Sequence, residues 1–265
     1  MSRLDQALVE RGLCESREKA KRLILAGQVR VNGQPARKPS DAVKPADELA
    51  LDAPEKFVSR GGHKLEHALE QFGLPVAGLT AIDLGASTGG FTDCLLQRGA
   101  AKVFAVDVGQ GQLAWKLRGD KRVVVMEKTN ARYLTCEHFR GQQNQPSTPR
   151  IQHQISQTSA APPADLIVVD CSFISLKKIL PPAVPLLKPD GKIVALIKPQ
   201  FEAGKAEADK GRGVITDAAI HQRVLAELKE FVAAQTGLCW RDVVESPLLG
   251  PAGNKEFLAL IEKVR

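Results

Sequence analysis

The chain has 265 residues and a formal net charge of +7, and 43% of its residues are hydrophobic. This composition is typical of a globular protein with one or two domains and a real hydrophobic core. The positive charge favours polyanionic partners, although basic proteins without such a partner are also common.

The five cysteines are scattered along the chain, and no Cys-x-x-Cys pair occurs. This pattern argues against a disulfide framework and a zinc site, and it favours a reducing compartment. The first residues lack the apolar core of a signal peptide, and no apolar run approaches the length of a membrane span. We therefore expect a soluble cytoplasmic protein that needs neither a membrane nor a metal.

Residues 1–55 carry the pattern of two short helices followed by small strands. Apolar residues recur at helical spacing up to Gly12, and Ser16 is placed to cap a second, basic helix that ends at Gly27. Residues 29–35 form a strand pattern that contains an Asn-Gly pair, the signal of a hairpin turn.

This order of helix, basic helix and hairpin resembles the S4-like RNA-binding domain, first described in a ribosomal small-subunit protein. The resemblance implies contacts with the phosphates and the shape of RNA rather than with base sequence. The alternative is that the helix charges only solvate one helix face. The residues expected to contact RNA are Arg3, Arg17, Lys19, Lys21, Arg22, Arg30, Asn32 and Arg60.

A loop of small residues follows an apolar run that ends at Asp83. The loop spans 85–90, and a helical pattern follows over 91–98. A strand, loop and helix in this order open a βαβ unit, whose loop lies at the carboxyl edge of the sheet, where α/β folds bind ligands. The spacing is Gly-x-x-x-Gly-Gly, unlike the dinucleotide-binding pattern, and no Gly-Lys-Ser/Thr follows, which excludes a P-loop.

A second short strand ends at Asp107, about twenty residues further on, where a Rossmann-like fold presents an acid to ribose hydroxyls. A nucleoside cofactor without a pyrophosphate fits both features, which suggests S-adenosylmethionine. The alternative is a tight turn with a solvated acid. The residues expected to bind the cofactor are Asp83, Gly85, Ala86, Ser87, Thr88, Gly89, Gly90, Phe91, Asp107, Asn130 and Asp170.

The rest of the chain alternates apolar strands with helical patterns, which predicts an α/β fold with a mostly parallel sheet. A continuous apolar strand over 164–170 ends in Asp170. A fifth strand is expected over 192–202, with Lys198 at the end of its apolar part.

The predicted organisation is an S4-like domain over 1–55, a linker over 56–60 and an α/β domain over 61–265. Residues 141–163 are rich in Gln, Ser, Thr and Pro and are expected to form a flexible surface insertion. Residues 240–264 are expected to end the chain in a hairpin at the sheet edge.

Charged residues gather at the predicted carboxyl edge of the sheet, where Asp107, Asp170 and Lys198 each terminate a strand. A lysine at the end of an apolar strand is costly unless it is paired, and a nearby carboxylate offsets that cost. Lys64 lies at the start of a predicted helix, where the helix dipole disfavours a cation. It is therefore either functional or a plain surface lysine, and Glu256 in the last hairpin is a further candidate.

Five motifs, in this order, closely resemble the TlyA family. They are Ser-Arg-Gly-Gly-His-Lys-Leu from residue 59, Asp-Leu-Gly-Ala-Ser-Thr-Gly-Gly-Phe-Thr from 83, Val-Asp-Cys-Ser-Phe-Ile-Ser from 169, Ile-Lys-Pro-Gln-Phe-Glu from 197 and Asn-Lys-Glu-Phe-Leu from 254. That family joins an S4-like domain to an FtsJ-like ribose methyltransferase domain. Its members, often labelled hemolysins, methylate the 2′-oxygen of cytidines in ribosomal RNA.

The resemblance implies a catalytic Lys-Asp-Lys-Glu tetrad at Lys64, Asp170, Lys198 and Glu256. It also implies direct displacement, in which Lys198 deprotonates or orients the 2′-hydroxyl, the two carboxylates set its charge and position, and Lys64 orients the nucleotide. Ribosomal RNA within a ribosomal subunit would be the substrate. The alternatives are a membrane-active hemolysin, a non-catalytic RNA-binding or ribosome-assembly factor, and a small-molecule methyltransferase, which the basic N-terminal region disfavours.

Overall fold

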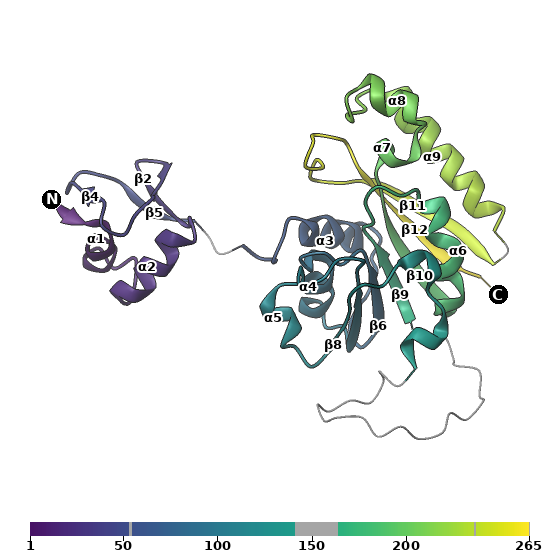
Figure 1. Cartoon of the computed structure of the whole chain (residues 1–265), viewed down its shortest axis with the longest axis horizontal. Coiled ribbons are helices and arrows are strands. Elements are labelled where there is room, and N and C mark those ends of the chain that lie inside the picture. The colour runs from purple at the N-terminus through teal and green to yellow at the C-terminus, as the bar shows by residue number, and fades with distance from the viewer. Residues whose placement is uncertain (53–54, 141–163, 236, 265) are drawn as a thin grey trace. The chain divides into compact units, whose positions relative to one another are not determined.

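The computed structural model describes residues 1–52, 55–140, 164–235 and 237–264. Its elements form two compact units, Met1–Lys56 and Phe57–Arg265, and Figure 1 labels most of the helices and strands of each. The insertion expected at 141–163 lies outside the described residues.

The first unit is a small α+β fold. Its elements are β1 (Ser2–Arg3), α1 (Leu4–Glu10), α2 (Arg17–Leu25), β2 (Val29–Val31), β3 (Gln34–Pro35), β4 (Ala42–Val43) and β5 (Leu49–Leu51). Strand β1 pairs with β4, and β3, β2 and β5 form a second sheet in that order.

Both local signals predicted for this unit are confirmed. The Ser16 hydroxyl caps α2 by accepting a hydrogen bond from the Lys19 N–H at 3.2 Å. The hairpin between β2 and β3 turns at Asn32 and Gly33, whose φ angles are 50° and 77°. Positive φ at both central residues is what a two-residue hairpin loop requires, and asparagine and glycine adopt it most readily.

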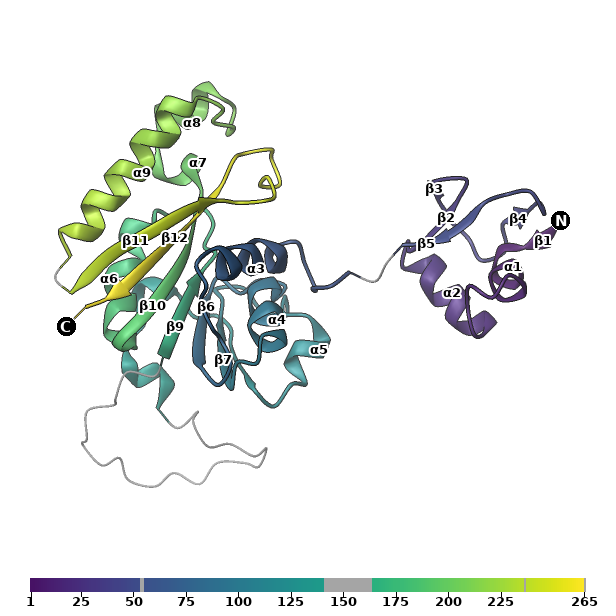
Figure 2. The same cartoon turned by 180° about the vertical axis from the view of Figure 1, so that it is seen from behind.

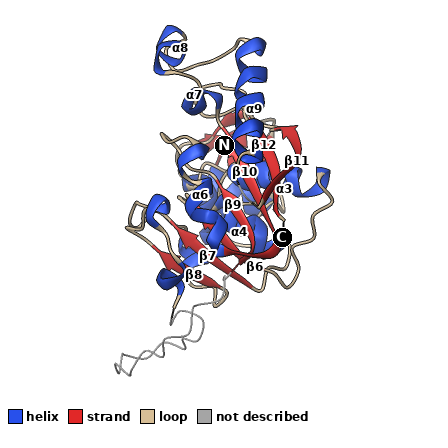
Figure 3. Ribbon diagram, turned by 90° about the vertical axis from the view of Figure 1, so that its right-hand side faces the viewer, coloured by secondary structure: helices blue, strands red, loops and turns tan. Residues whose placement is uncertain are grey.

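The second unit is a seven-stranded sheet with helices on both faces (Figure 3). Its elements are α3 (Gly61–Gln71), β6 (Thr80–Leu84), α4 (Gly90–Gln97), β7 (Lys102–Val106), α5 (Trp115–Arg118), β8 (Val123–Met126), β9 (Ala164–Val169), α6 (Leu180–Ala183), β10 (Leu187–Ile197), α7 (Pro199–Glu202), α8 (Lys205–Lys210), α9 (Ala218–Ala233), β11 (Leu238–Glu245) and β12 (Phe257–Lys263). The strand order is β11-β12-β10-β9-β6-β7-β8, in which β10 through β8 run parallel and β12 is antiparallel to both of its neighbours.

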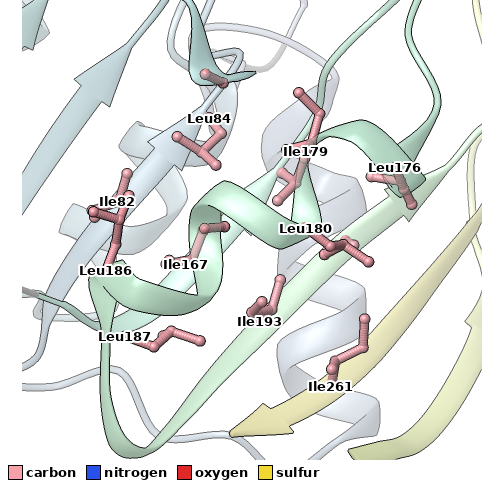
Figure 4. Close-up of a cluster of buried hydrophobic side chains, with 14 of the residues drawn as sticks. Ile82, Leu84, Ile167, Leu176, Ile179, Leu180, Leu186, Leu187, Ile193 and Ile261 are labelled. Atoms are coloured by element: carbon pink, nitrogen blue, oxygen red, sulfur yellow. The ribbon is translucent and has the colours of Figure 1, made fainter. Parts of the chain in front are cut away.

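Alternate side chains of each central strand enter two different cores. On β9, Leu166 and Val168 pack in the cluster with α3 and α4, whereas Ile167 and Val169 pack in the cluster with α6 and α9. Figure 4 shows the second cluster, to which β6, β9, β10, β12 and α6 all contribute. Both faces of the strand are therefore buried, which explains its continuous apolar run. Figures 1 and 2 show from opposite sides how the two helical layers cover the sheet.

Three predicted boundaries differ from the structure. The fifth strand ends at Ile197, because Pro199 favours the first position of a helix and begins α7. The terminal hairpin is antiparallel as expected, but β12 lies inside the sheet and only β11 forms the edge. The helix expected from Lys64 begins three residues earlier, at Gly61, so Lys64 is past its first turn.

The linker expected at 56–60 is also corrected. Phe57 is buried in the core of the second unit, with its ring edge-on to that of His63 at 5.0 Å. The N–H of Val58 donates to Asp93 Oδ2 at 2.8 Å. A free connection cannot bury a phenylalanine in this way, so the chain from residue 57 onward belongs to the second unit.

Candidate active site

A cavity of about 670 Å³ opens at the carboxyl edge of the parallel strands in the second unit. Its walls come from the start of α3, the loop after β6, the ends of β9 and β10 with α7, and the loop before β12. All four predicted catalytic residues line it, namely Lys64, Asp170, Lys198 and Glu256. Segments that are far apart in the sequence thus meet at one site, as expected for an open α/β sheet.

The glycines of the loop after β6 let protein segments approach one another. At Gly85, φ is +87°, and a Cβ atom would lie 2.6 Å from the carbonyl oxygen of Asp170. At Gly90, a Cβ atom would lie 2.3 Å from the Ser59 hydroxyl oxygen. Any side chain at either position would push apart two walls of the cavity. Gly85, Ala86, Ser87, Thr88, Gly90 and Phe91, which the sequence assigned to the cofactor, line the cavity.

Asp83 lies beneath this loop and outside the cavity lining. It is fully buried and accepts a hydrogen bond from the Thr92 hydroxyl at 2.7 Å. Burial, together with the nearby carboxylates of Asp170 and Asp107, raises the pKa of Asp83 to about 7. Its position fits an anchor for the loop and the start of α4 rather than a ligand contact.

Asp107, which follows the neighbouring strand β7, accepts a hydrogen bond from the same loop. One carboxylate oxygen accepts the Ser87 N–H at 2.8 Å, and the other accepts the Gly109 N–H at 2.6 Å. Asp107 and Gly89 lie beside the lining residues rather than among them. The predicted adenine contact, Asn130, is exposed, accepts the Arg132 N–H at 3.0 Å, and is likewise outside the lining.

The four charged residues form two ion pairs. Lys198 Nζ lies 2.6 Å from Asp170 Oδ1 and donates a hydrogen bond to the Ser172 hydroxyl at 2.8 Å. Lys64 pairs with Glu256 Oε2, and both side chains are almost completely buried. The pairing predicted for Lys198 from the cost of burying a lysine is therefore present, and Lys64 is paired as well. Removal of one partner of the buried Lys64–Glu256 pair would leave an uncompensated charge.

An aromatic wall made of Phe173 and Phe201 borders the Asp170–Lys198 pair. Phe173 is 90% exposed, and its ring centroid lies 5.0 Å from that of Phe201. The φ angle of Phe173 is +62°, an unusual value for a bulky residue. An exposed ring held in a costly conformation at a cavity wall indicates a contact surface for a flat ligand.

Two further residues hold the walls of the cavity. Glu202 in α7 accepts the Ser175 hydroxyl at 2.6 Å and the Leu176 N–H at 2.7 Å, and burial raises its pKa. Asn254, which is 1% exposed, donates to the Gly213 carbonyl and accepts from the Ile215 N–H, each at 2.8 Å.

No role was predicted from the sequence for these wall residues. They lie within or next to the recognised motifs, in Val-Asp-Cys-Ser-Phe-Ile-Ser, Ile-Lys-Pro-Gln-Phe-Glu and Asn-Lys-Glu-Phe-Leu. The motifs were therefore the available signal for Ser172, Phe173, Phe201, Glu202 and Asn254, but only the structure gives their contacts.

The residues predicted to contact RNA differ in whether an acidic side chain pairs with them. Arg3 and Arg17 both pair with Asp5, Lys19 pairs with Glu15, and Arg30 pairs with Asp52. The Asn32 amide bonds to the Asp47 side chain and the Glu48 N–H. Lys21 and Arg22 are exposed on α2. Arg60 belongs to the second unit, where it lines the cavity.

Comparison with family models matches both units. Residues 57–263 match the FtsJ-like methyltransferase model, and residues 2–49 match the S4 domain model. The chain is 47% identical over 97% of its length to the 16S/23S rRNA (cytidine-2′-O)-methyltransferase TlyA of Mycobacterium tuberculosis, of which it covers 88%.

Other relatives carry a different name. The chain is 40% identical to Hemolysin A of Brachyspira hyodysenteriae over 97% of its own length and 98% of that protein. A solved structure of a protein named as a hemolysin, from Streptococcus thermophilus, superposes with a TM-score of 0.70 at 42% identity and covers 99% of this chain and 88% of its own. Within the described residues, none of the helices has the length and apolar character needed to cross a membrane. The chain belongs to the FtsJ-like methyltransferases, in the TlyA family that joins this domain to an N-terminal S4 domain.

Proposed function

We propose that this protein transfers a methyl group from S-adenosylmethionine to the ribose 2′-hydroxyl of a cytidine in ribosomal RNA. The observation that carries the proposal is the pair of lysine–carboxylate contacts, Lys198 with Asp170 and Lys64 with Glu256, on the wall of one cavity. The relative named as a cytidine-2′-O-methyltransferase supports the choice of nucleotide.

The loop after β6 fits a nucleoside cofactor. The volume of about 670 Å³ is within the usual range for small-molecule sites and leaves room for a nucleoside and part of a nucleotide substrate. The loop backbone from Gly85 to Thr88 would hold the cofactor, and Asp107 would accept its ribose hydroxyls, because each carboxylate oxygen keeps a free lone pair beside its one N–H partner. S-adenosylmethionine supplies an electrophilic methyl group on a sulfonium centre.

Lys198 is the group proposed to act on the 2′-hydroxyl. In its neutral form it accepts the hydroxyl proton, and Asp170 stabilises the ammonium that results. The Lys64–Glu256 pair fixes the other side of the site and orients the nucleotide. Much of the rate arises from this positioning, because the attacking oxygen must approach the methyl group in line.

The aromatic wall of Phe173 and Phe201 would hold the target base. Every base has a flat face, and stacking on an exposed aromatic ring is a common means of holding an unpaired nucleotide. The exposed ring of Phe173 lies three residues after Asp170, the carboxylate that follows β9, so a stacked base would have its ribose close to the charged pair. The S4 unit supplies binding to the RNA backbone, within a ribosomal subunit in the cytoplasm.

The product identifies the reaction. Ribosomal subunits that lack the modification are incubated with the protein and S-adenosylmethionine, and their RNA is digested to nucleosides for mass spectrometry. We expect 2′-O-methylcytidine to appear in proportion to the enzyme. A base-methylated cytidine would overturn the choice of oxygen, and RNA binding without any methylated nucleoside would favour the assembly-factor alternative.

A further inference from the structure

The Lys198 side chain has two acceptors in the structure, and only one of them is a carboxylate. Its Nζ lies 2.6 Å from Asp170 Oδ1 and 2.8 Å from the Ser172 hydroxyl oxygen. The lysine side chain is 10% exposed, so water has little access to it. Ser172 is itself exposed and lines the same cavity.

These two contacts determine where the reactive lone pair of the amine points. The neutral form of lysine has two N–H bonds and one lone pair around a tetrahedral nitrogen. With a single acceptor, rotation about the terminal carbon–nitrogen bond would leave the lone pair two equivalent positions. With one N–H on Asp170 and the other on Ser172, the lone pair takes the single position that is left. A base must meet the hydroxyl proton with this geometry for the transfer to be efficient.

The loop that carries Ser172 is held on both sides. The N–H of Asp170 donates to the carbonyl of Leu84 in the neighbouring strand at 2.9 Å. Beyond Ser172, Glu202 accepts the backbone N–H of Leu176 at 2.7 Å. A hydroxyl on such a loop keeps a fixed position relative to the end of β10, where Lys198 lies.

We propose that Ser172 is a positioning residue for methyl transfer, which directs the lone pair of Lys198 toward the target hydroxyl by accepting one of its N–H bonds. The assignment rests on the proposed function, because it concerns the same site and the same reaction. Ser172 takes no proton in this role and makes no bond to the substrate.

The test compares three variants of the full-length protein with the wild type, using unmodified ribosomal subunits as substrate. In Ser172→Ala we expect kcat to fall about 10- to 100-fold, as for small losses of alignment at a reacting centre. The KM for subunits and the Kd for S-adenosylmethionine by calorimetry should stay close to the wild-type values. Ser172→Thr keeps the hydroxyl and should restore most of kcat.

Ser175→Ala is the matched control, because it removes a hydroxyl of the same loop that bonds to Glu202 and not to Lys198, whereas the backbone contact of Leu176 with Glu202 remains. It should lower the melting temperature while leaving kcat near the wild-type value. A wild-type kcat in Ser172→Ala, or an equal loss of kcat in Ser172→Ala and Ser175→Ala, would overturn the positioning role. A wild-type protein that methylates no 2′-oxygen would instead overturn the proposed function and this role with it.

Discussion

Two aspartates show how burial and neighbouring charges move the pKa of a carboxyl in opposite directions in this chain. Arg3 donates a hydrogen bond to Asp5 and Arg17 pairs with it, and these contacts hold the pKa of Asp5 at about 2. Asp83 is buried beneath the glycine loop near two further carboxylates, and its pKa is raised to about 7. From its place at the end of an apolar run, Asp83 was predicted to contact the cofactor. The burial of its side chain depends on how α4 packs against β6, which no local sequence pattern reveals.

The raised pKa of Asp83 makes stability depend on pH in a definite direction. The folded protein holds this proton up to about pH 7, whereas the unfolded chain releases it near pH 3.8. Between these values the folded state binds more protons, so the contribution of Asp83 to the free energy of unfolding falls as pH rises. Asp83→Asn cannot ionise, and its amide oxygen can still accept from Thr92. We expect its melting temperature, followed by calorimetry between pH 4 and pH 7, to decline less with pH than that of the wild type, and parallel curves would contradict this.

At the scale of elements, the parallel strands explain why the proximity of Asp170 and Lys198 could be predicted from the sequence. Asp170 and Lys198 each follow an apolar run, and the ends of parallel strands meet at one edge of a sheet. The hairpin at 29–35 was predictable for a similar local reason, because Asn32 and Gly33 suit its turn. The contacts of Ser172 and Asn254 could not be predicted, because each depends on a loop conformation set by distant residues.

Asn254 joins two elements that border the cavity. Its amide connects the Gly213–Ile215 segment to the loop that precedes β12. Asn254→Ala removes one donor and one acceptor and leaves the Gly213 carbonyl and the Ile215 N–H without that partner. We expect it to lower the free energy of unfolding by about 1–3 kcal/mol, measured in urea.

Asn254→Asp serves as the matched variant for this prediction. It keeps the acceptor for Ile215 but places an anion beside the Gly213 carbonyl, so it should destabilise the protein at least as much as the alanine variant. An unchanged urea midpoint in both variants would show that the contacts of the Asn254 amide contribute nothing to the stability of the protein.

At the scale of the whole molecule, the chain combines a basic RNA-binding unit with a catalytic unit. Several basic residues of the first unit are paired with acids of the same unit, which reduces the charge that they can offer to RNA. Lys21 and Arg22, adjacent on the exposed side of α2, are the candidates for phosphate contacts. The sequence predicted all of these residues alike, although only the pairs of Arg17 with Asp5 and Arg30 with Asp52 join residues that are distant in the chain.

The double variant Lys21→Glu/Arg22→Glu tests whether Lys21 and Arg22 contact RNA phosphates. Each lost phosphate contact should make the negative slope of log affinity against log salt shallower by about 1. The affinity for ribosomal subunits should also fall at low salt. The Kd for S-adenosylmethionine should not change. Lys229→Glu, an exposed residue of α9 with the same change of charge per residue, is the control and should keep the wild-type slope. Equal effects of the two substitutions would indicate a general effect of net charge.

The proposed role of the Lys198–Asp170 pair is tested by measuring methyl transfer with wild type and Lys198→Ala side by side. Tritiated S-adenosylmethionine and unmodified ribosomal subunits are the substrates. Lys198 follows β10 and is not among the residues proposed to hold the cofactor, so the variant should bind S-adenosylmethionine with a wild-type Kd. We expect wild type to label the 2′-oxygen of a cytidine and Lys198→Ala to give no label above background. Equal labelling by the two proteins would contradict the role given to the Lys198–Asp170 pair.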